Sequence, residues 1–165
     1  SFPTRRSSDL TGLYNRMGYQ KLSISYFTIM REKKMPVLVM FIDLDRLKYI
    51  NDTFGHEYGD FAIVSIAKAM LKHCDADAIA ARTGGDEFIV LEGAKDEESG
   101  RVLAQKIRTE LSKTQRAMQL PFDLSASIGA VVAHPGEENV LESYVKRAEM
   151  LMYEEKAEKK VSRDS

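Results

Sequence analysis

The chain has 165 residues, of which 44% are hydrophobic and 30% are charged, a size and composition that favour one folded domain with a packed core. No apolar run is long enough to cross a bilayer, and a formal charge of −1 gives no general attraction to nucleic acid or to a membrane surface. The single cysteine, Cys74, excludes an internal disulfide framework and a multi-cysteine zinc site, and it fits a reducing compartment.

The first ten residues differ from the rest because they show neither an amphipathic pattern nor the apolar centre of a signal peptide. They resemble a translated sequencing-library adapter, so we expect a non-native stretch here; the alternative is an ordinary polar linker. The expected division is a non-native or disordered stretch at 1–10, one domain at 11–160 and a tail at 161–165. On this interpretation, a sensory or dimerisation region of the natural protein lies upstream and is missing from the chain.

The first half of the chain predicts a helix, a buried strand and a second helix. The first helix is indicated by four apolar residues at helical spacing: Leu22, Tyr26, Ile29 and Met30. Pro36 ends that segment, and the continuous apolar run 37–42 predicts a buried central strand. A polar, glycine-containing stretch at 51–60 then leads into a helix expected at 61–71.

The second half predicts a hairpin, a helix, a strand and a last helix. Strand-like runs at 78–82 and 87–91 flank Gly84-Gly85, and because glycines tolerate positive φ angles, this pair favours a tight turn. The remaining elements are a helix that opens at 95–99, a strand at 127–133 and a helix at 141–159. Four residues of the last helix are expected to face inward: Tyr144, Ala148, Leu151 and Met152. This order predicts an α/β (α+β) sandwich with a mixed, mostly antiparallel sheet.

Carboxylates gather at the predicted strand ends. Asp43 and Asp45 alternate at the end of the central strand, so both side chains leave the same face of the sheet. Asp86 and Glu87 follow the hairpin glycines, and Asp86 converges with Asp43 if the hairpin packs beside the central strand. Carboxylates this close repel each other, whereas a divalent cation between them attracts both, and oxygen ligands favour Mg²⁺ or Mn²⁺. The alternative for each carboxylate alone is ordinary turn chemistry.

Several segments together resemble a known family. The segment 43–60, DLDRLKYINDTFGHEYGD, resembles the D-x-D-x-F-K-x-x-N-D-x-x-G-H-x-x-G-D signature of the GGDEF family, and residues 84–88 are the GGDEF motif itself. Further family landmarks match in the same order: TGLYNR at 11–16, SIG at 127–129 and MYEEK at 152–156. The chain is therefore similar to this family over nearly the whole predicted domain.

The resemblance implies a palm-like, ferredoxin-like fold and diguanylate cyclase activity, in which two GTP molecules condense into cyclic di-GMP and pyrophosphate leaves. Because each domain holds one GTP, it also implies a homodimer with facing active sites. The alternative is a catalytically silent, GTP-binding regulatory module, which is disfavoured because all five expected motif residues are present: Asp43, Asn51, Asp60, Asp86 and Glu87. The domain is expected in the cytoplasm, and the sequence leaves open whether its parent protein is anchored to a membrane.

The same resemblance assigns roles to individual residues. The implied metal ligands are Asp43, the backbone carbonyl of Leu44 and Asp86, with two Mg²⁺ or Mn²⁺ ions per site. The implied catalytic residues are Asp86, Glu87 and Lys48, and the implied substrate-binding residues are Asn51, His56, Asp60, Lys156 and Lys160. Asn51 and Asp60 match the guanine-reading positions, where a carboxylate accepts hydrogen bonds from N1–H and the 2-amino group that adenine lacks. Alternatives remain a backbone-capping histidine at His56 and a solvated helix end at Lys156 and Lys160.

Overall fold

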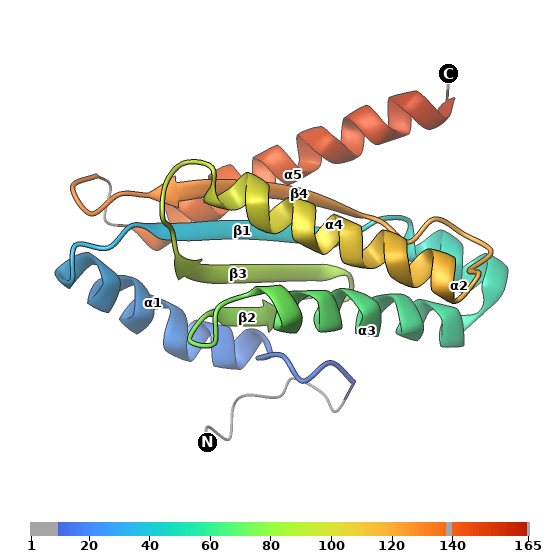
Figure 1. Ribbon diagram of the computed structural model, residues 1–165, viewed down its shortest axis with the longest axis horizontal. Helices are drawn as coiled ribbons and strands as arrows, with labels where there is room; N and C mark the ends of the chain where they lie inside the picture. The colour runs from blue at the N-terminus through green and yellow to red at the C-terminus, as the bar shows by residue number, and fades with distance from the viewer. Residues whose placement is uncertain (1–9, 138–139, 165) are drawn as a thin grey trace.

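The computed structural model describes residues 10–137 and 140–164, in which helices cover both faces of one sheet (Figure 1). The elements in chain order are α1 Arg16–Glu32, β1 Val37–Leu44, α2 Leu47–Phe54, α3 His56–His73, β2 Ile79–Arg82, β3 Glu87–Gly93, α4 Ser99–Ala117, β4 Ala126–Ala133 and α5 Leu141–Asp164. None of the helices in the described ranges is long and apolar enough to cross a membrane. Residues 1–9 of the predicted non-native stretch 1–10 lie outside the described residues.

The sheet has the strand order β2-β3-β1-β4, and each neighbouring pair is antiparallel. An isolated parallel bridge between Tyr14 and Ala81 joins the N-terminal segment to the β2 edge, outside the four antiparallel strands. The β2–β3 hairpin packs beside β1, and strands β3 and β1 occupy the two central positions of the sheet. The α/β class and the mostly antiparallel sheet are therefore confirmed.

The alternation of β1 side chains divides the core into two parts. Leu38 and Met40 face the cluster formed with α3 and α4, whereas Val39 and Phe41 face the cluster formed with α1 and α5. Figure 1 shows α3 and α4 in front of the sheet and α5 behind it. Asp43 continues the second series, so its side chain emerges on the face that α5 covers.

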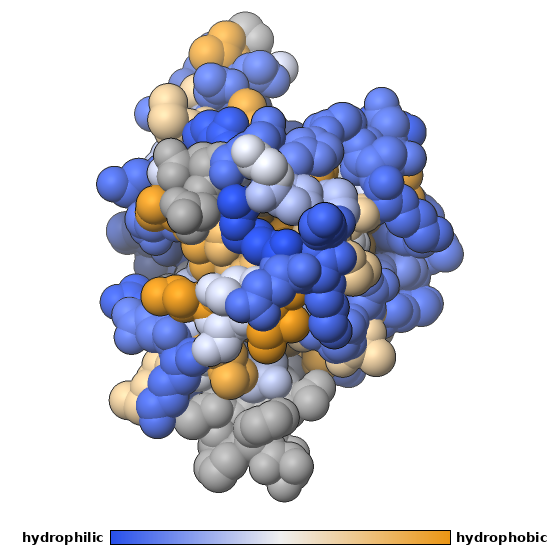
Figure 2. Space-filling view, turned by 90° about the vertical axis from the view of Figure 1, so that its left-hand side faces the viewer, coloured by the Kyte–Doolittle hydropathy of each residue, from blue (hydrophilic) through white to orange (hydrophobic). Residues whose placement is uncertain are grey.

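The two ends of the sheet differ in what they present. Figure 2 shows the end at which β1 begins, where hydrophobic residues are interspersed with hydrophilic ones. At the opposite end, where β1 finishes, buried acidic side chains replace the apolar series. The acidic end is therefore the region in which a polar site is built.

One of the four residues predicted to face inward in the last helix, Leu151, is wrong, because it is 41% exposed. Ile29, one of the apolar residues that indicated the first helix, is 49% exposed. The residues that do face the sheet in these helices are Phe27 and Met30 in α1 and Tyr144, Ala148 and Met152 in α5. In α5 they recur every four residues, so Leu151 lies one position away from the buried stripe.

The polar stretch 51–60 is helical on both sides of Gly55, because α2 ends at Phe54 and α3 begins at His56. Gly55 has a φ of 102°, which L side chains rarely adopt, and this conformation lets two helices meet through one residue. Helix α2 packs Leu47, Ile50 and Phe54 against the core at helical spacing, but the polar residues between Ile50 and Phe54 led the sequence analysis to expect a polar stretch there. The start of the second helix, predicted at residue 61, is therefore wrong.

The turn between β2 and β3 also differs from the expected geometry. The glycines with positive φ in the described part of the chain are Gly12 and Gly55, so neither Gly84 nor Gly85 uses that freedom. Instead, the backbone N–H groups of Thr83 and Gly84 both donate to the carbonyl of Glu87. The turn is consequently a wider loop than the two-residue turn that a Gly-Gly pair predicts.

Helix α5 contacts β4 directly through its backbone. A Cβ atom at Gly129 would lie 2.0 Å from the Ala148 carbonyl oxygen and 2.5 Å from the Met152 nitrogen. The missing side chain thus sets how closely the helix approaches the strand. Because α5 is continuous, this contact also sets where its later residues reach the acidic end of the sheet.

We predict that Gly129→Ala displaces α5 and lowers the free energy of unfolding by about 2 kcal/mol, a typical cost of overpacking. Urea denaturation measures this loss. Gly136→Ala is the matched control, because a Cβ atom there meets nothing within 4 Å. Equal stabilities of the two variants would contradict the close contact.

Candidate functional site

Three carboxylates converge where β1 ends and the hairpin begins. Asp43 is opposite Glu87 in the register of β1 and β3, and Asp86 directly precedes Glu87. One oxygen from each of the three carboxylates lies within 4.8 Å of the others. The structure therefore brings Asp43 and Asp86 into one group, here called the carboxylate cluster, with Glu87 as its third member.

Asp43 has an oxygen that the protein leaves without a hydrogen bond. Within the described ranges, its buried Oδ1 atom has no hydrogen-bond partner, and the Nζ atom of Lys156 lies 3.6 Å away. A buried, unsatisfied carboxylate oxygen is costly, and a divalent cation between carboxylates removes that cost. Hard oxygen ligands suit Mg²⁺ or Mn²⁺, so the residues of the cluster fit such an ion.

Two members of the cluster, Asp43 and Glu87, have pKa values raised above those of isolated carboxyl groups. Burial raises the pKa of Asp43 to about 7; Lys156 opposes this shift, and Asp86 and Glu87 add to it. Burial also raises the pKa of Glu87, with further contributions from Asp86 and Glu149. Near neutral pH, a cation that binds here therefore displaces protons from the cluster.

Main-chain hydrogen bonds fix the meeting point of the two segments. The Leu44 N–H donates to the Asp86 carbonyl at 2.9 Å, and the Asp45 N–H donates to the Ser125 carbonyl at 2.9 Å. Leu44, whose carbonyl is an expected ligand, is thus directly beside Asp86. The loop before β4 is tied to the same strand end.

Two arginines hold the turn that carries Asp86. Arg16 of α1 donates to the Thr83 carbonyl through Nε at 2.9 Å and Nη2 at 2.7 Å. Arg82 donates to the Gly85 carbonyl through Nη2 at 2.8 Å, and its Nε lies 3.2 Å from the Gly84 carbonyl. The sequence analysis assigned neither arginine a role, although Arg16 belongs to one of the matched landmarks. These bonds restrain a glycine turn that would otherwise have wide conformational freedom.

Asp45 lies beside the cluster but, unlike Asp43, it is fully paired. Its Oδ2 accepts from the Ser125 hydroxyl and from Lys159 Nζ, each at 2.7 Å. Its Oδ1 accepts from the Ser127 hydroxyl at 2.7 Å and from Lys156 Nζ at 3.3 Å. Burial raises the pKa of Asp45, but the bonds from Lys159, Ser127 and Ser125 outweigh burial and hold it below its ordinary value. Asp45 therefore stays ionised under conditions in which Asp43 takes up a proton.

Asn51 and Asp60 lie on neighbouring helices, α2 and α3. The Asn51 side chain covers Gly59 so closely that a Cβ atom there would lie 1.7 Å from Asn51 Oδ1. Gly59 is buried, and the residue after it, Asp60, is exposed. The contact between the two helices thus brings the Asn51 amide to the residue that precedes Asp60.

Three expected site residues, Lys48, His56 and Lys160, have no described contact with the carboxylate cluster or with the Asn51 and Asp60 pair. Lys48 donates to Asp52 at 2.7 Å, and its side chain is 89% exposed. His56 begins α3, Lys160 lies near the end of α5, and both are exposed. Their roles toward a substrate stay predictions.

Comparisons with known proteins agree with this geometry. The family profile described as "Diguanylate cyclase, GGDEF domain" matches residues 8–162. The diguanylate cyclase VdcA of Vibrio cholerae is 34% identical over 151 residues, which cover 89% of this chain and 43% of VdcA. The cyclic di-GMP phosphodiesterase NbdA of Pseudomonas aeruginosa is 28% identical over 152 residues, which cover 92% of this chain and 19% of NbdA. The chain thus spans less than half the length of either relative.

Solved structures match the fold over most of the chain. The GGDEF domain of TpbB, also called YfiN, from Pseudomonas aeruginosa has a TM-score of 0.78 and 28% identity, over 93% of this chain and 90% of that one. The arrangement of sheet and helices is therefore the palm-like fold of GGDEF domains.

We predict that Asp43→Asn stabilises the metal-free protein at pH 8. A carboxyl group whose pKa rises from 3.8 to about 7 on folding contributes stability at low pH and loses that contribution as the pH rises through this interval. The variant should gain on the order of 2 kcal/mol at pH 8 and little at pH 4. Thermal unfolding in EDTA at the two pH values measures the difference.

The control for this prediction is Asp52→Asn, which removes a carboxylate from an exposed ion pair with Lys48 and should change stability little. Added Mg²⁺ should raise the Tm of the unmodified protein at pH 8 and leave that of Asp43→Asn unchanged. A metal response that survives Asp43→Asn would place the ion elsewhere.

Proposed function

We propose, since the chain belongs to the GGDEF family of diguanylate cyclase domains, that it is an active cyclase that makes cyclic di-GMP from GTP. The 3′-oxygen of one GTP attacks the α-phosphorus of a second GTP, and the bond from that phosphorus to the pyrophosphate leaving group breaks. A second, reciprocal transfer closes the ring, so two pyrophosphates leave for each product. The carboxylate cluster beside Lys156 is the observation that carries this proposal.

The carboxylate cluster supplies the ligands and the proton acceptor. Asp43, the Leu44 carbonyl and Asp86 hold two divalent ions, Mg²⁺ or Mn²⁺. When bound, such ions neutralise triphosphate charge and lower the pKa of the attacking hydroxyl. Asp86 accepts the 3′-hydroxyl proton with Glu87 beside it, and the raised pKa of Glu87 brings that carboxyl closer to the value that suits proton transfer at neutral pH.

Guanine recognition falls to Asn51 and Asp60. The Asp60 carboxylate accepts hydrogen bonds from guanine N1–H and the 2-amino group, and the Asn51 amide completes the reading of the same edge. Adenine lacks these donors, so it would leave the carboxylate unpaired, which costs a few kcal/mol in binding. The close contact of Asn51 with Gly59 supports this role, because it holds the amide in one place.

Basic side chains bind the triphosphate. Lys156 already lies at the carboxylate cluster, and Lys160 follows one turn later on α5. Lys48, which is exposed on α2, turns from Asp52 toward the charge that develops during transfer. His56 adds a further substrate contact at the start of α3.

The active species is a homodimer, because each domain holds one GTP and both 3′-hydroxyls must reach the opposite α-phosphate. A sensory or dimerisation region upstream of this chain would set how often the two domains meet. The isolated domain therefore binds GTP, yet it turns GTP over slowly unless two copies are held together.

We predict that concentrated protein, or a fused tandem copy, converts GTP and Mg²⁺ into cyclic di-GMP, identified by mass. Asp86→Ala should lower the rate at least a hundredfold, because it removes a ligand and the proton acceptor, while the Tm changes by only a few degrees. Glu32→Ala is the control, since it removes an exposed carboxylate at the end of α1.

Two results would decide against this function. Binding of GTP without product, even in the fused tandem copy, would support a catalytically silent regulatory module. Near-normal rates in Asp86→Ala would show that the carboxylate cluster does not perform the chemistry.

We predict that Gly59→Ala weakens the preference for GTP over ATP about tenfold without lowering stability. A glycine-to-alanine change inside a helix normally adds up to about 1 kcal/mol of stability, whereas the new Cβ atom must displace the Asn51 amide. Competition binding with GTP and ATP, alongside Tm, measures both effects. In an Asn51→Ala background, Gly59→Ala should change selectivity no further; additive losses would show that Gly59 acts elsewhere.

A further inference from the structure

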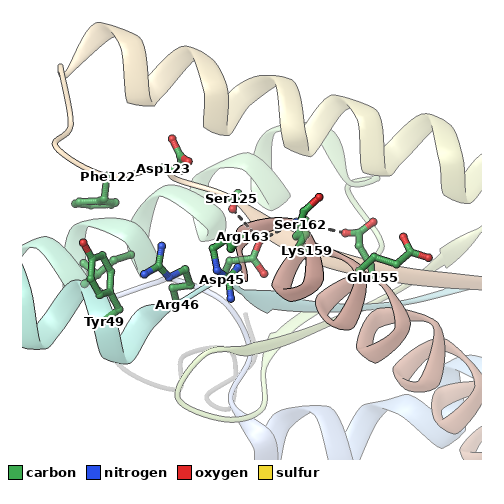
Figure 3. Close-up of a pocket in the computed structure, with 12 residues that line it drawn as sticks. Asp45, Arg46, Tyr49, Phe122, Asp123, Ser125, Glu155, Lys159, Ser162 and Arg163 are labelled. Atoms are coloured by element: carbon green, nitrogen blue, oxygen red, sulfur yellow. Dashed lines mark hydrogen bonds and ion pairs between the residues drawn. The ribbon is translucent and has the colours of Figure 1, made fainter. Parts of the chain in front are cut away.

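Two lysines of α5 share the buried carboxylates at the end of β1. Lys156 Nζ lies 3.3 Å from Asp45 Oδ1 and 3.6 Å from Asp43 Oδ1. Lys159 Nζ lies 2.7 Å from Asp45 Oδ2 and also donates to the Ala126 carbonyl at 2.8 Å. Asp45, Ser125 and Lys159 line a pocket of about 510 Å³, in which both Ser125 and Lys159 donate to Asp45 (Figure 3).

Lys159 is held in this position by hydrogen bonds to Asp45 and to strand β4. The Ala126 carbonyl belongs to the edge strand β4, and Glu155, one turn earlier on α5, accepts from the Ile128 N–H of the same strand at 3.0 Å. Glu155 also accepts from Arg108 of α4 at 2.6 Å. Lys159 therefore points to the strand edge and Asp45, and its contacts do not include the carboxylate cluster.

The number of cations that neutralise Asp45 determines whether the Lys156 ammonium group pairs with Asp45 or stays available to a ligand. Asp45 is buried and all its hydrogen-bond partners are donors, two serine hydroxyls and two lysines, so a carboxylate in this position needs a cation close by. Lys159 supplies this cation through its 2.7 Å ion pair with Asp45. Lys156, which lies 3.3 Å from Asp45, is held more loosely between Asp45 and Asp43. Without Lys159, Lys156 is the nearest cation and would be drawn fully onto Asp45.

We propose that Lys159 is a positioning residue that neutralises Asp45 and thereby leaves Lys156 free to bind the terminal phosphates of GTP. This inference rests on the proposed function, because it assigns Lys156 to that substrate. It gives Asp45 a role distinct from that of Asp43. Asp43 offers a cation an oxygen that accepts no hydrogen bond, whereas Asp45 anchors the helix that carries the phosphate-binding side chain.

Equilibrium binding of GTP and GMP separates this role from a general loss of structure. Lys159→Met should weaken GTP binding roughly tenfold, the size expected for one charge-assisted hydrogen bond, and leave GMP binding unchanged. Lys159→Arg should retain GTP binding. Lys146→Met, which removes the same charge from an exposed position on α5, is the matched control.

The decisive variant removes both partners of the ion pair. Asp45→Asn with Lys159→Met should restore GTP binding to within about threefold, because Lys156 is then no longer drawn onto position 45. If the double variant stays as weak as Lys159→Met, Lys159 contacts the phosphates itself and the proposal is wrong. An equal loss of GMP and GTP binding in Lys159→Met would likewise overturn it.

A second measurement needs no nucleotide. In urea denaturation of the metal-free protein, Lys156→Met should shift the midpoint at least twice as far in the Lys159→Met background, because Lys156 is then the main cation on Asp45. Additive shifts would overturn the proposal. If the unmodified protein binds no GTP, the proposed function fails. The urea double-mutant cycle of Lys156→Met and Lys159→Met still reports whether Lys159 keeps Lys156 from Asp45.

Discussion

Two carboxylates two residues apart, buried on one face at the end of the central strand, set the constraint on which the rest of the structure depends. Strand alternation forces Asp43 and Asp45 to the same side, where mutual repulsion and burial both oppose ionisation. The protein resolves this by giving the two residues different surroundings. Asp45 receives two hydroxyls and two lysines, whereas Asp43 faces two further carboxylates and keeps an oxygen that accepts no hydrogen bond.

Segments far apart in the chain meet to maintain this difference. The backbone contact at Gly129 brings α5 close enough for its lysines to reach the end of β1. Arg16 and Arg82 restrain the hairpin turn, so that Asp86 and Glu87 stay opposite Asp43. The carboxylate cluster is thus organised before any ligand arrives, and preorganised charge of this kind is what transfer of a phosphoryl group requires.

The sequence was informative where residues of one chemical type lie together, as in the apolar run 37–42 and in the carboxylates that follow it. The apolar run before Asp43 and the paired carboxylates predicted both the strand and the meeting of Asp43 with Asp86. Helix α2 was missed although Leu47, Ile50 and Phe54 recur at helical spacing, because the polar residues at 51–53 and Gly55 indicated a loop. The roles of Lys159 and Arg82 were missed for another reason: they depend on which helix face meets which strand edge, and that register is a property of tertiary packing.

We expect the carboxylate cluster to bind a divalent cation in exchange for the protons that burial holds there. Electron paramagnetic resonance of Mn²⁺, titrated into the protein at pH 5.5 and pH 8, measures this exchange. Binding should be much tighter at pH 8 than at pH 5.5, because the pKa of Asp43 is raised to about 7, and this site should be lost in Asp43→Asn. Equal affinity at both pH values, or binding that survives Asp43→Asn, would contradict this expectation.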